Sequence, residues 1–178
     1  MANPQKQKGD RREREAVALC VRTLPDLVLP TASRELGAGR KNDTGDLAVF
    51  PDVCVQVKGR DDIARALAIA VDAAVRQQAN RGVDLHLGLV PIPHARAGAR
   101  WLAVTRSWPV EIDADALPTA GIPSRVIAAI RDKDSIVPLD ARVHRILNTR
   151  VEPMIVASWE AWAVAYRQRR TQSLVCSA

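Results

Sequence analysis

The sequence predicts an α/β fold in which a mixed central β-sheet is flanked by helices and followed by a C-terminal helical extension. Hydrophobic residues make up 47% of the 178-residue chain, which is enough to bury a core. Aromatic residues make up only 3%, so the core must be mainly aliphatic, as where helices pack on a sheet. Segments with helical spacing and with strand-like alternation also follow one another along the first two thirds of the chain.

Three regions are expected from the pattern of charge and periodicity. Residues 1–10 are predicted to be a flexible basic tail. Residues 11–110 contain the alternating helices and strands and are predicted to form the main domain. Residues 111–178 are Pro-rich at first and then helical in pattern, and are predicted to be an extension whose role the sequence does not define.

The first helix is predicted from Arg11 to about Thr23, because apolar residues recur there at helical spacing. Asp10 is the expected N-cap and Pro25 the expected stop. A short strand or edge segment is expected at 27–33, followed by a polar, Gly-containing loop.

The next two strands are expected at 47–50 and 53–58, as an antiparallel hairpin that turns at Pro51-Asp52. An amphipathic helix should run from Ile63 to about Asn80, with a capping Asp61 or Asp62 before it.

Gly82 is the expected stop signal of that helix. Strands are predicted at 85–92 and 101–105, separated by a basic loop at 94–100. Further helices are predicted at 124–131 and near 158–170.

Charge and cysteine content limit the class of protein. The formal net charge of +6 permits nucleic-acid binding but does not require it. The three cysteines are far apart and form no CxxC pair, which argues against a zinc site or a disulfide framework. The polar N-terminus lacks the apolar core of a signal peptide, and no apolar run is long enough for a membrane span, so a cytoplasmic protein is expected.

The predicted hairpin carries a set of polar side chains that suits phosphodiester hydrolysis. That reaction needs a divalent cation, hard oxygen ligands to hold it, and a group that positions the attacking water. Asp46 begins the first strand of the hairpin, and Gln56 and Lys58 lie on the second. Because side chains alternate between faces, Gln56 and Lys58 point the same way, away from the face of Val57.

The register of the hairpin decides whether Asp46 joins this pair. If Phe50 pairs with Cys54, Asp46 lies opposite Lys58 and shares its face. If Phe50 pairs with Val53, Asp46 points to the other face. A catalytic site at this hairpin therefore predicts the first register.

At these residues the chain resembles the PD-(D/E)xK nuclease superfamily, and more narrowly the archaeal-type Holliday junction resolvases. The matching segments cover roughly residues 6–105 and are KGDRRERE (8–15), GAGRKNDTGDLAVF (37–50) and VCVQVKG (53–59). Gly45 replaces the Pro of the family name, and Gln56 replaces its acidic residue. Mrr-type nucleases of the same superfamily also have Gln-x-Lys. The resemblance implies a restriction-endonuclease-like fold.

The resemblance also implies roles for individual residues. Asp46 would be the principal ligand of a Mg²⁺ or Mn²⁺ ion, and Glu13 would complete the metal shell from the first helix. Gln56 and the carbonyl of Val57 would add oxygen ligands, and Lys58 would orient the attacking water. Glu15 is an alternative to Glu13 for this role. The two side chains point in nearly opposite directions on a helix, so only one of them can face the sheet.

The function implied is a structure-selective DNA endonuclease, such as a Holliday junction resolvase, acting as a homodimer on four-way junctions. Alternatives are a restriction- or repair-type nuclease for other DNA structures, and a catalytically inactive DNA-binding module with the same fold. The expected DNA-binding residues are basic side chains of the N-terminal segment and of the Gly-containing loop: Lys8, Arg11, Arg14, Arg40 and Lys41.

Overall fold

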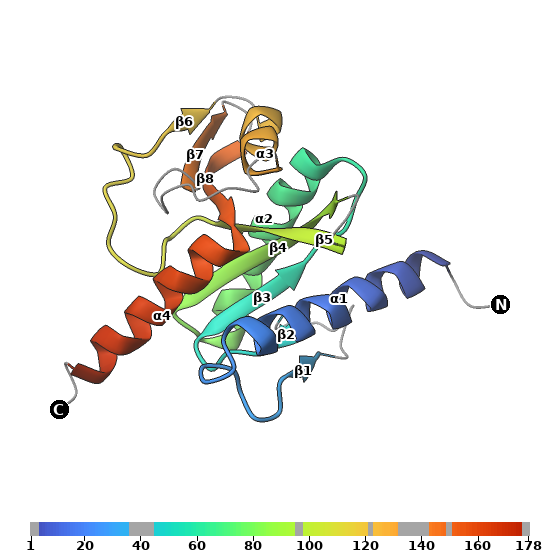
Figure 1. The fold of residues 1–178 in the computed structure, drawn as a ribbon, viewed down its shortest axis with the longest axis vertical. Coiled ribbons are helices and arrows are strands. Elements are labelled where there is room, and N and C mark those ends of the chain that lie inside the picture. Colours follow the sequence, from blue (N-terminus) through green and yellow to red (C-terminus); the bar gives the residue numbers. More distant parts are fainter. Residues whose placement is uncertain are drawn as a thin grey trace. The chain divides into compact units, whose positions relative to one another are not determined.

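The computed structural model describes residues 4–35, 45–94, 98–120, 123–131, 143–148 and 151–175. The chain divides into two compact units, Met1–Pro91 and Ile92–Ala178. Helices pack on strands in both units (Figure 1), and the predicted class, α/β with a mixed sheet flanked by helices, is confirmed.

The first unit contains two helices and the strands β1 to β4. Their strand order is β1-β2-β3-β4, with antiparallel pairing of β1 with β2 and of β2 with β3, and parallel pairing of β3 with β4. The helix α2 makes the crossover between the two parallel strands. The bounds are α1 Pro4–Thr23, β1 Ser33–Arg34, β2 Leu47–Ala48, β3 Val53–Val57, α2 Ile63–Arg81 and β4 Leu85–His94.

The second unit contains the strands β5 to β8 in the order β5-β8-β7-β6. Here β8 pairs antiparallel with both β5 and β7, while β6 and β7 are parallel and joined through α3. The bounds are β5 Gly98–Thr105, β6 Thr119–Ala120, α3 Pro123–Arg131, β7 Val143–Asn148, β8 Val151–Ser158 and α4 Trp159–Val175.

The C-terminal region differs from the predicted helical extension. The two predicted helices are present as α3 and α4, but β6, β7 and β8 were not predicted. The strand β5 was predicted to belong to the main domain. Because β5 pairs with β8, it groups with the C-terminal residues. The boundary between the two compact units follows Pro91.

The first helix begins earlier than expected. Residues 4–10 of the predicted tail are helical and belong to α1, so Asp10 lies inside the helix and is not its N-cap. Pro4 suits the first helical position, where no N–H donor is needed. Pairs of opposite charge support the charged part of the helix, with Arg11 2.8 Å and Arg12 2.6 Å from carboxylate oxygens of Glu15.

The caps predicted for α2 are confirmed. The side chain of Asp62 accepts a hydrogen bond of 3.0 Å from the N–H of Arg65, and so satisfies one of the free donors of the first turn. Gly82 ends the helix with φ +67°, and its N–H donates to the carbonyl of Gln78. These caps fix where the chain leaves β3 and enters β4.

The register of β2 and β3 differs from both registers considered from the sequence. Leu47 lies opposite Val55, so the strands are offset by two residues from the predicted pairing of Phe50 with Cys54. β2 ends at Ala48 because the next carbonyls have other partners: Val49 accepts from the N–H of Leu29, and Phe50 accepts from Arg81. A shift of two residues keeps every side chain on its predicted face.

The interior of each unit is mainly aliphatic, as expected. In the first unit all of β3 is buried, and α2 covers it with residues such as Leu67 and Val71. In the second unit, Trp159, Trp162 and Tyr166 of α4 are buried and stacked, with ring centroids 5.5 and 5.1 Å apart. Within the described residues, none of the helices combines the length and the apolar composition that a membrane span requires.

Candidate active site

Asp46 and Lys58 lie together where the β2–β3 hairpin opens. Asp46 directly precedes β2, and Lys58 directly follows β3. The carboxylate oxygen Oδ2 of Asp46 accepts a hydrogen bond of 2.9 Å from the N–H of Val57 and lies 3.4 Å from Nζ of Lys58. The side chains are only 16% and 30% exposed, so this ion pair is partly shielded from water.

Gly45 determines how Asp46 approaches β3. It has φ +115°, and a Cβ at this position would lie 2.9 Å from the carbonyl oxygen of Val55. Only glycine fits both the dihedral angle and this close approach. The next N–H, that of Asp46, donates to the same carbonyl at 2.9 Å, so the backbone holds the carboxylate against the end of β3.

Gln56 is on the same face of β3 as Lys58 and is buried, with 1% of its surface exposed. Its oxygen Oε1 is also buried and accepts no hydrogen bond from the described residues. A buried acceptor without a partner costs about 1–3 kcal/mol. The unpartnered Oε1 of Gln56 is therefore a feature that needs an explanation.

Glu13 reaches the same region from α1. A Cβ on Gly59 would lie 3.3 Å from Cγ of Arg12, so the helix passes close to the chain just after Lys58. Burial raises the pKa of Glu13, and the nearby negative charge of Asp46 raises it further, against the lowering effect of a hydrogen bond from Arg34. The charge of Asp46 therefore acts on the carboxylate of Glu13.

Glu15 faces a different environment from Glu13. Burial alone would raise the pKa of Glu15, but hydrogen bonds from Arg11 and Arg12 outweigh this effect and lower it. Both partners are on the same helix. Of the two rival carboxylates, Glu13 is therefore the one whose pKa responds to the charge of Asp46.

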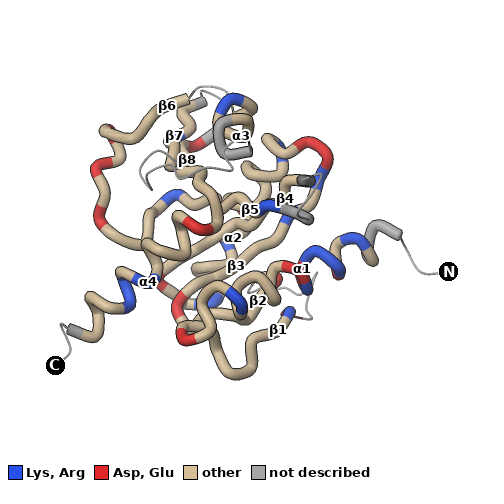
Figure 2. Tube along the Cα trace, viewed as in Figure 1, with Lys and Arg blue, Asp and Glu red and all other residues tan. Residues whose placement is uncertain are grey.

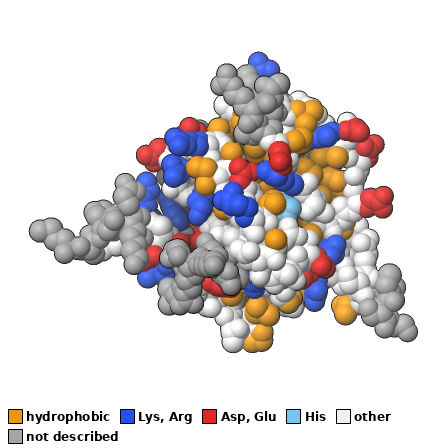
Figure 3. All heavy atoms as spheres, turned by 180° about the vertical axis from the view of Figure 1, so that it is seen from behind, with side chains coloured by type: hydrophobic (Ala, Val, Ile, Leu, Met, Phe, Trp, Pro, Cys, Tyr) orange, Lys and Arg blue, Asp and Glu red, His pale blue; other side chains and the backbone are white. Residues whose placement is uncertain are grey.

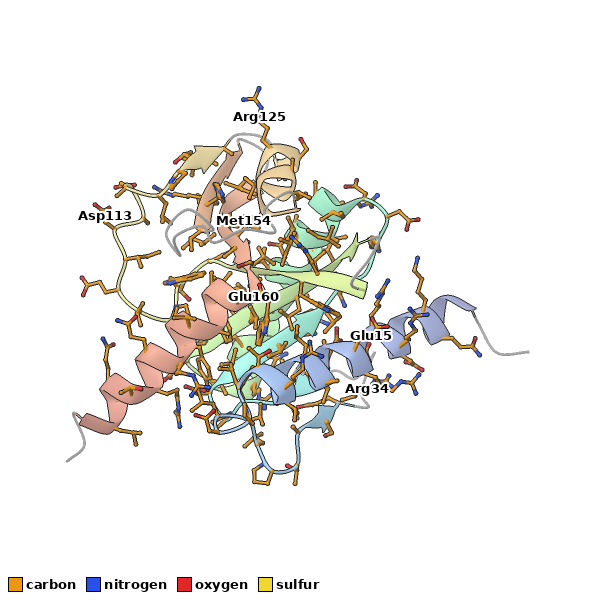
Figure 4. All side chains as sticks on the ribbon, in the orientation of Figure 1. Glu15, Arg34, Asp113, Arg125, Met154 and Glu160 are labelled. Carbon is orange, nitrogen blue, oxygen red and sulfur yellow. The ribbon has the colours of Figure 1, made fainter. Side chains whose placement is uncertain are left out.

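Arg34 is a member of this cluster that the sequence did not reveal. Its Nε donates to Oε2 of Glu13 at 2.7 Å, and its Nη2 donates to Oδ1 of Asp10 at 2.6 Å. The hydrogen bond to Glu13 is the main cause of the raised pKa of Arg34. The residue lies on β1 beside α1 (Figure 4), and nothing in its local sequence signals a contact with a helix that ends eleven residues earlier.

The predicted DNA-binding residues have varied surroundings. Lys8 lies 3.5 Å from a carboxylate oxygen of Asp61, and Arg11 is paired with Glu15. Arg14 is exposed on α1, whose many basic residues are visible in Figure 2. Arg40 and Lys41 fall outside the described residues.

The cluster offers oxygen donors of the kind that Mg²⁺ and Mn²⁺ prefer. These are the carboxylates of Glu13 and Asp46 and the unpartnered Oε1 of Gln56. The predicted use of the Val57 carbonyl stays a prediction, while the N–H of Val57 already binds Asp46. Across the described part of the chain, no three His, Cys, Asp or Glu side chains group closely enough to hold a metal ion, so Gln56 would have to complete such a site.

Comparison of the chain with protein-family models, with curated proteins and with solved structures finds no match. The geometry of the cluster is therefore what bears on function.

Proposed function

We propose that the protein is a metal-dependent, structure-selective DNA endonuclease that cuts branched DNA such as four-way junctions. The observation that carries this proposal is the contact between Asp46 and Lys58 at the end of one hairpin, together with the buried Oε1 of Gln56 on the same strand face, which has no partner among the described residues. A structural ion pair alone would not explain why a buried amide oxygen is left without a donor.

In this mechanism Asp46, Glu13 and Gln56 supply oxygen ligands to a divalent cation. The cation, when bound, would polarise the scissile phosphate and lower the pKa of a water molecule. Lys58 donates a hydrogen bond that orients the attacking water and offsets the negative charge that develops on the phosphate. The N–H of Val57 holds Oδ2 of Asp46, and Oδ1, which accepts no hydrogen bond from the described residues, would be available as a ligand.

Gln56 makes this donor set less negative than one with three carboxylates. An amide oxygen is a weaker ligand for a hard cation than a carboxylate oxygen. We therefore infer a site of moderate affinity that is filled at millimolar concentrations of Mg²⁺ and more readily by Mn²⁺, which binds such donors more tightly.

The wider assignment rests on the resemblance to the PD-(D/E)xK nucleases, and includes a restriction-endonuclease-like fold for the site and a homodimer as the active form. Two matched cuts across a junction require two active sites related by symmetry. Basic side chains of α1, such as Arg14, would contact phosphates and so select DNA by shape.

A panel of synthetic DNAs tests this proposal. The full-length protein is incubated with labelled four-way junctions, flaps, forks and linear duplexes, each with Mg²⁺, with Mn²⁺ and with EDTA. Cleavage of branched DNA that is faster than that of linear duplex and requires the metal supports the proposal. Equal cleavage of linear duplex excludes structure selectivity. If no DNA is cleaved, the remaining alternative is a catalytically inactive DNA-binding module.

A further inference from the structure

An open groove of about 630 Å³ runs between α1 and β1, close to the candidate site. Its exposed lining is mainly apolar along α1, with arginines at the sides. The lining residues are Arg14, Val17, Ala18, Val21 and Arg22 from the helix and Ser33 and Arg34 from the strand. Val21 is 40% exposed, which is high for a β-branched aliphatic side chain. This part of α1 therefore presents an apolar strip to solvent.

The arginines around α1 fall into two groups. Arg11 and Arg12 are paired with Glu15, and Arg34 is paired with Asp10 and Glu13. Arg14 and Arg22 line the groove and pair with no carboxylate of the described residues. Eight residues of helix separate them by about 12 Å. Two arginines that have no carboxylate partner among the described residues thus flank the apolar strip.

The groove is connected to the candidate site through Arg34. This side chain lines the groove and donates to Glu13, whose pKa responds to the charge of Asp46. A chain molecule lying in the groove would therefore extend towards the carboxylates. The volume lies within the roughly 300–1,000 Å³ of pockets that hold small organic ligands.

We propose that this groove binds an unpaired stretch of a DNA strand and leads it to the candidate site; this inference rests on the proposed nuclease function. An unpaired strand exposes the apolar faces of its bases together with its phosphates, and so matches an apolar strip flanked by arginines. A paired duplex hides its base faces and would leave the strip uncovered. The preferred substrates are therefore branched DNAs with unpaired nucleotides at the branch point.

A second copy of the chain fits the groove less well. In a two-fold contact the same patch meets itself, so Arg14 and Arg22 of one copy would face the same arginines of the other. The net charge of +6 adds to this repulsion. Charge complementarity favours a polyanion.

The test measures binding separately from cleavage. Fluorescence anisotropy in EDTA compares the affinity of the full-length protein for a labelled 20-nucleotide single strand and for the corresponding duplex. The variants are Arg22→Gln, Val21→Glu and, as a matched control, Arg76→Gln, which removes an exposed positive charge from α2. Circular dichroism and the thermal midpoint show that each variant is folded.

We expect the wild type to bind the single strand more tightly than the duplex. Arg22→Gln and Val21→Glu should each weaken single-strand binding about tenfold, while Arg76→Gln changes it less than about twofold. Equal losses for single strand and duplex, or no loss, would overturn the inference. So would a change of oligomeric state in the groove variants with unchanged DNA affinity, because the groove would then be a contact between copies.

Failure of this inference can be told apart from failure of the nuclease proposal. Groove-dependent binding without metal-dependent cleavage would overturn only the proposed enzymatic function. Metal-dependent cleavage of branched DNA with groove-independent binding would overturn only the role of the groove.

Discussion

Nζ of Lys58 lies 3.4 Å from Oδ2 of Asp46, although the two residues stand at the open ends of different strands. Three features position the two side chains for this contact. They are the register of β2 and β3, the positive φ of Gly45 and the hydrogen bond from the N–H of Val57. If the contact between Lys58 and Asp46 is part of a metal-dependent active site, substitutions around it should change protein stability, metal binding and DNA cleavage by different amounts.

Gln56→Leu should leave the protein as stable as the wild type or raise its stability by about 1 kcal/mol. The substitution removes a buried acceptor that has no partner among the described residues and keeps a similar volume. Cleavage of branched DNA should fall at the same time, because an oxygen ligand is lost. Urea denaturation and a cleavage assay measure the two effects, and a marked loss of stability would mean that Gln56 is structural.

Gln56→Glu should lower the stability of the metal-free protein, because it places a carboxylate without a partner at a buried position. Divalent cations should then raise its thermal midpoint more than that of the wild type, since the added charge strengthens metal binding. Thermal scans with EDTA and with Mn²⁺ provide the comparison. A metal response no larger than that of the wild type would argue against a cation at this position.

Gly45→Ala should destabilise the protein by about 3 kcal/mol, because the new Cβ would meet the carbonyl of Val55 at 2.9 Å in a strained backbone conformation. Gly82→Ala is the matched control. Gly82 also has a positive φ, but nothing lies within 4 Å of its added Cβ, so its cost should be only about 1 kcal/mol. Similar urea midpoints for the two variants would show that the backbone at Gly45 does not approach the carbonyl of Val55 as closely as the structure indicates.

Glu13 and Glu15 should affect stability in opposite directions as the pH changes. The pKa of Glu13 is raised above its ordinary 4.5, so its contribution is fully present below pH 4.5 and is lost as the pH rises through the higher folded pKa. The pKa of Glu15 is lowered, so its contribution is present above pH 4.5 and is lost as the pH falls through the folded pKa.

The measurement is the urea midpoint of the wild type, Glu13→Gln and Glu15→Gln in EDTA at pH 4 and pH 7. The wild type should lose stability relative to Glu13→Gln between pH 4 and pH 7, and gain stability relative to Glu15→Gln. The same trend in both variants would contradict the different environments of the two carboxylates.

The sequence predicted best those parts that depend on local patterns. The limits of α2 follow from Asp62 and Gly82, whose capping chemistry acts within one turn. The face shared by Gln56 and Lys58 follows from strand alternation alone, and remained correct although the predicted register was wrong by two residues. Whether Asp46 shares that face was left open between two registers, and its role was inferred from the resemblance to the nuclease superfamily.

The features that were not predicted depend on contacts between distant segments. Arg34 joins Asp10 and Glu13 from another element, and no local pattern marks it. β8 contains Pro153, which argues against a central strand in a sequence, yet β8 pairs on both sides with β5 and β7. Asp10 resembled an N-cap, but charge pairs and Pro4 extend the helix past it.

The most direct test of the central claim is cleavage of a synthetic four-way junction by the wild type and by Asp46→Asn, with DNA binding measured in parallel. Asp46→Asn keeps an oxygen that can accept from the N–H of Val57 and removes the negative charge from the site. The account predicts metal-dependent cleavage by the wild type, at least about 100-fold slower cleavage by Asp46→Asn, and nearly equal binding. Cleavage by Asp46→Asn at the wild-type rate, or its complete absence in both proteins, would contradict a metal-dependent active site at Asp46.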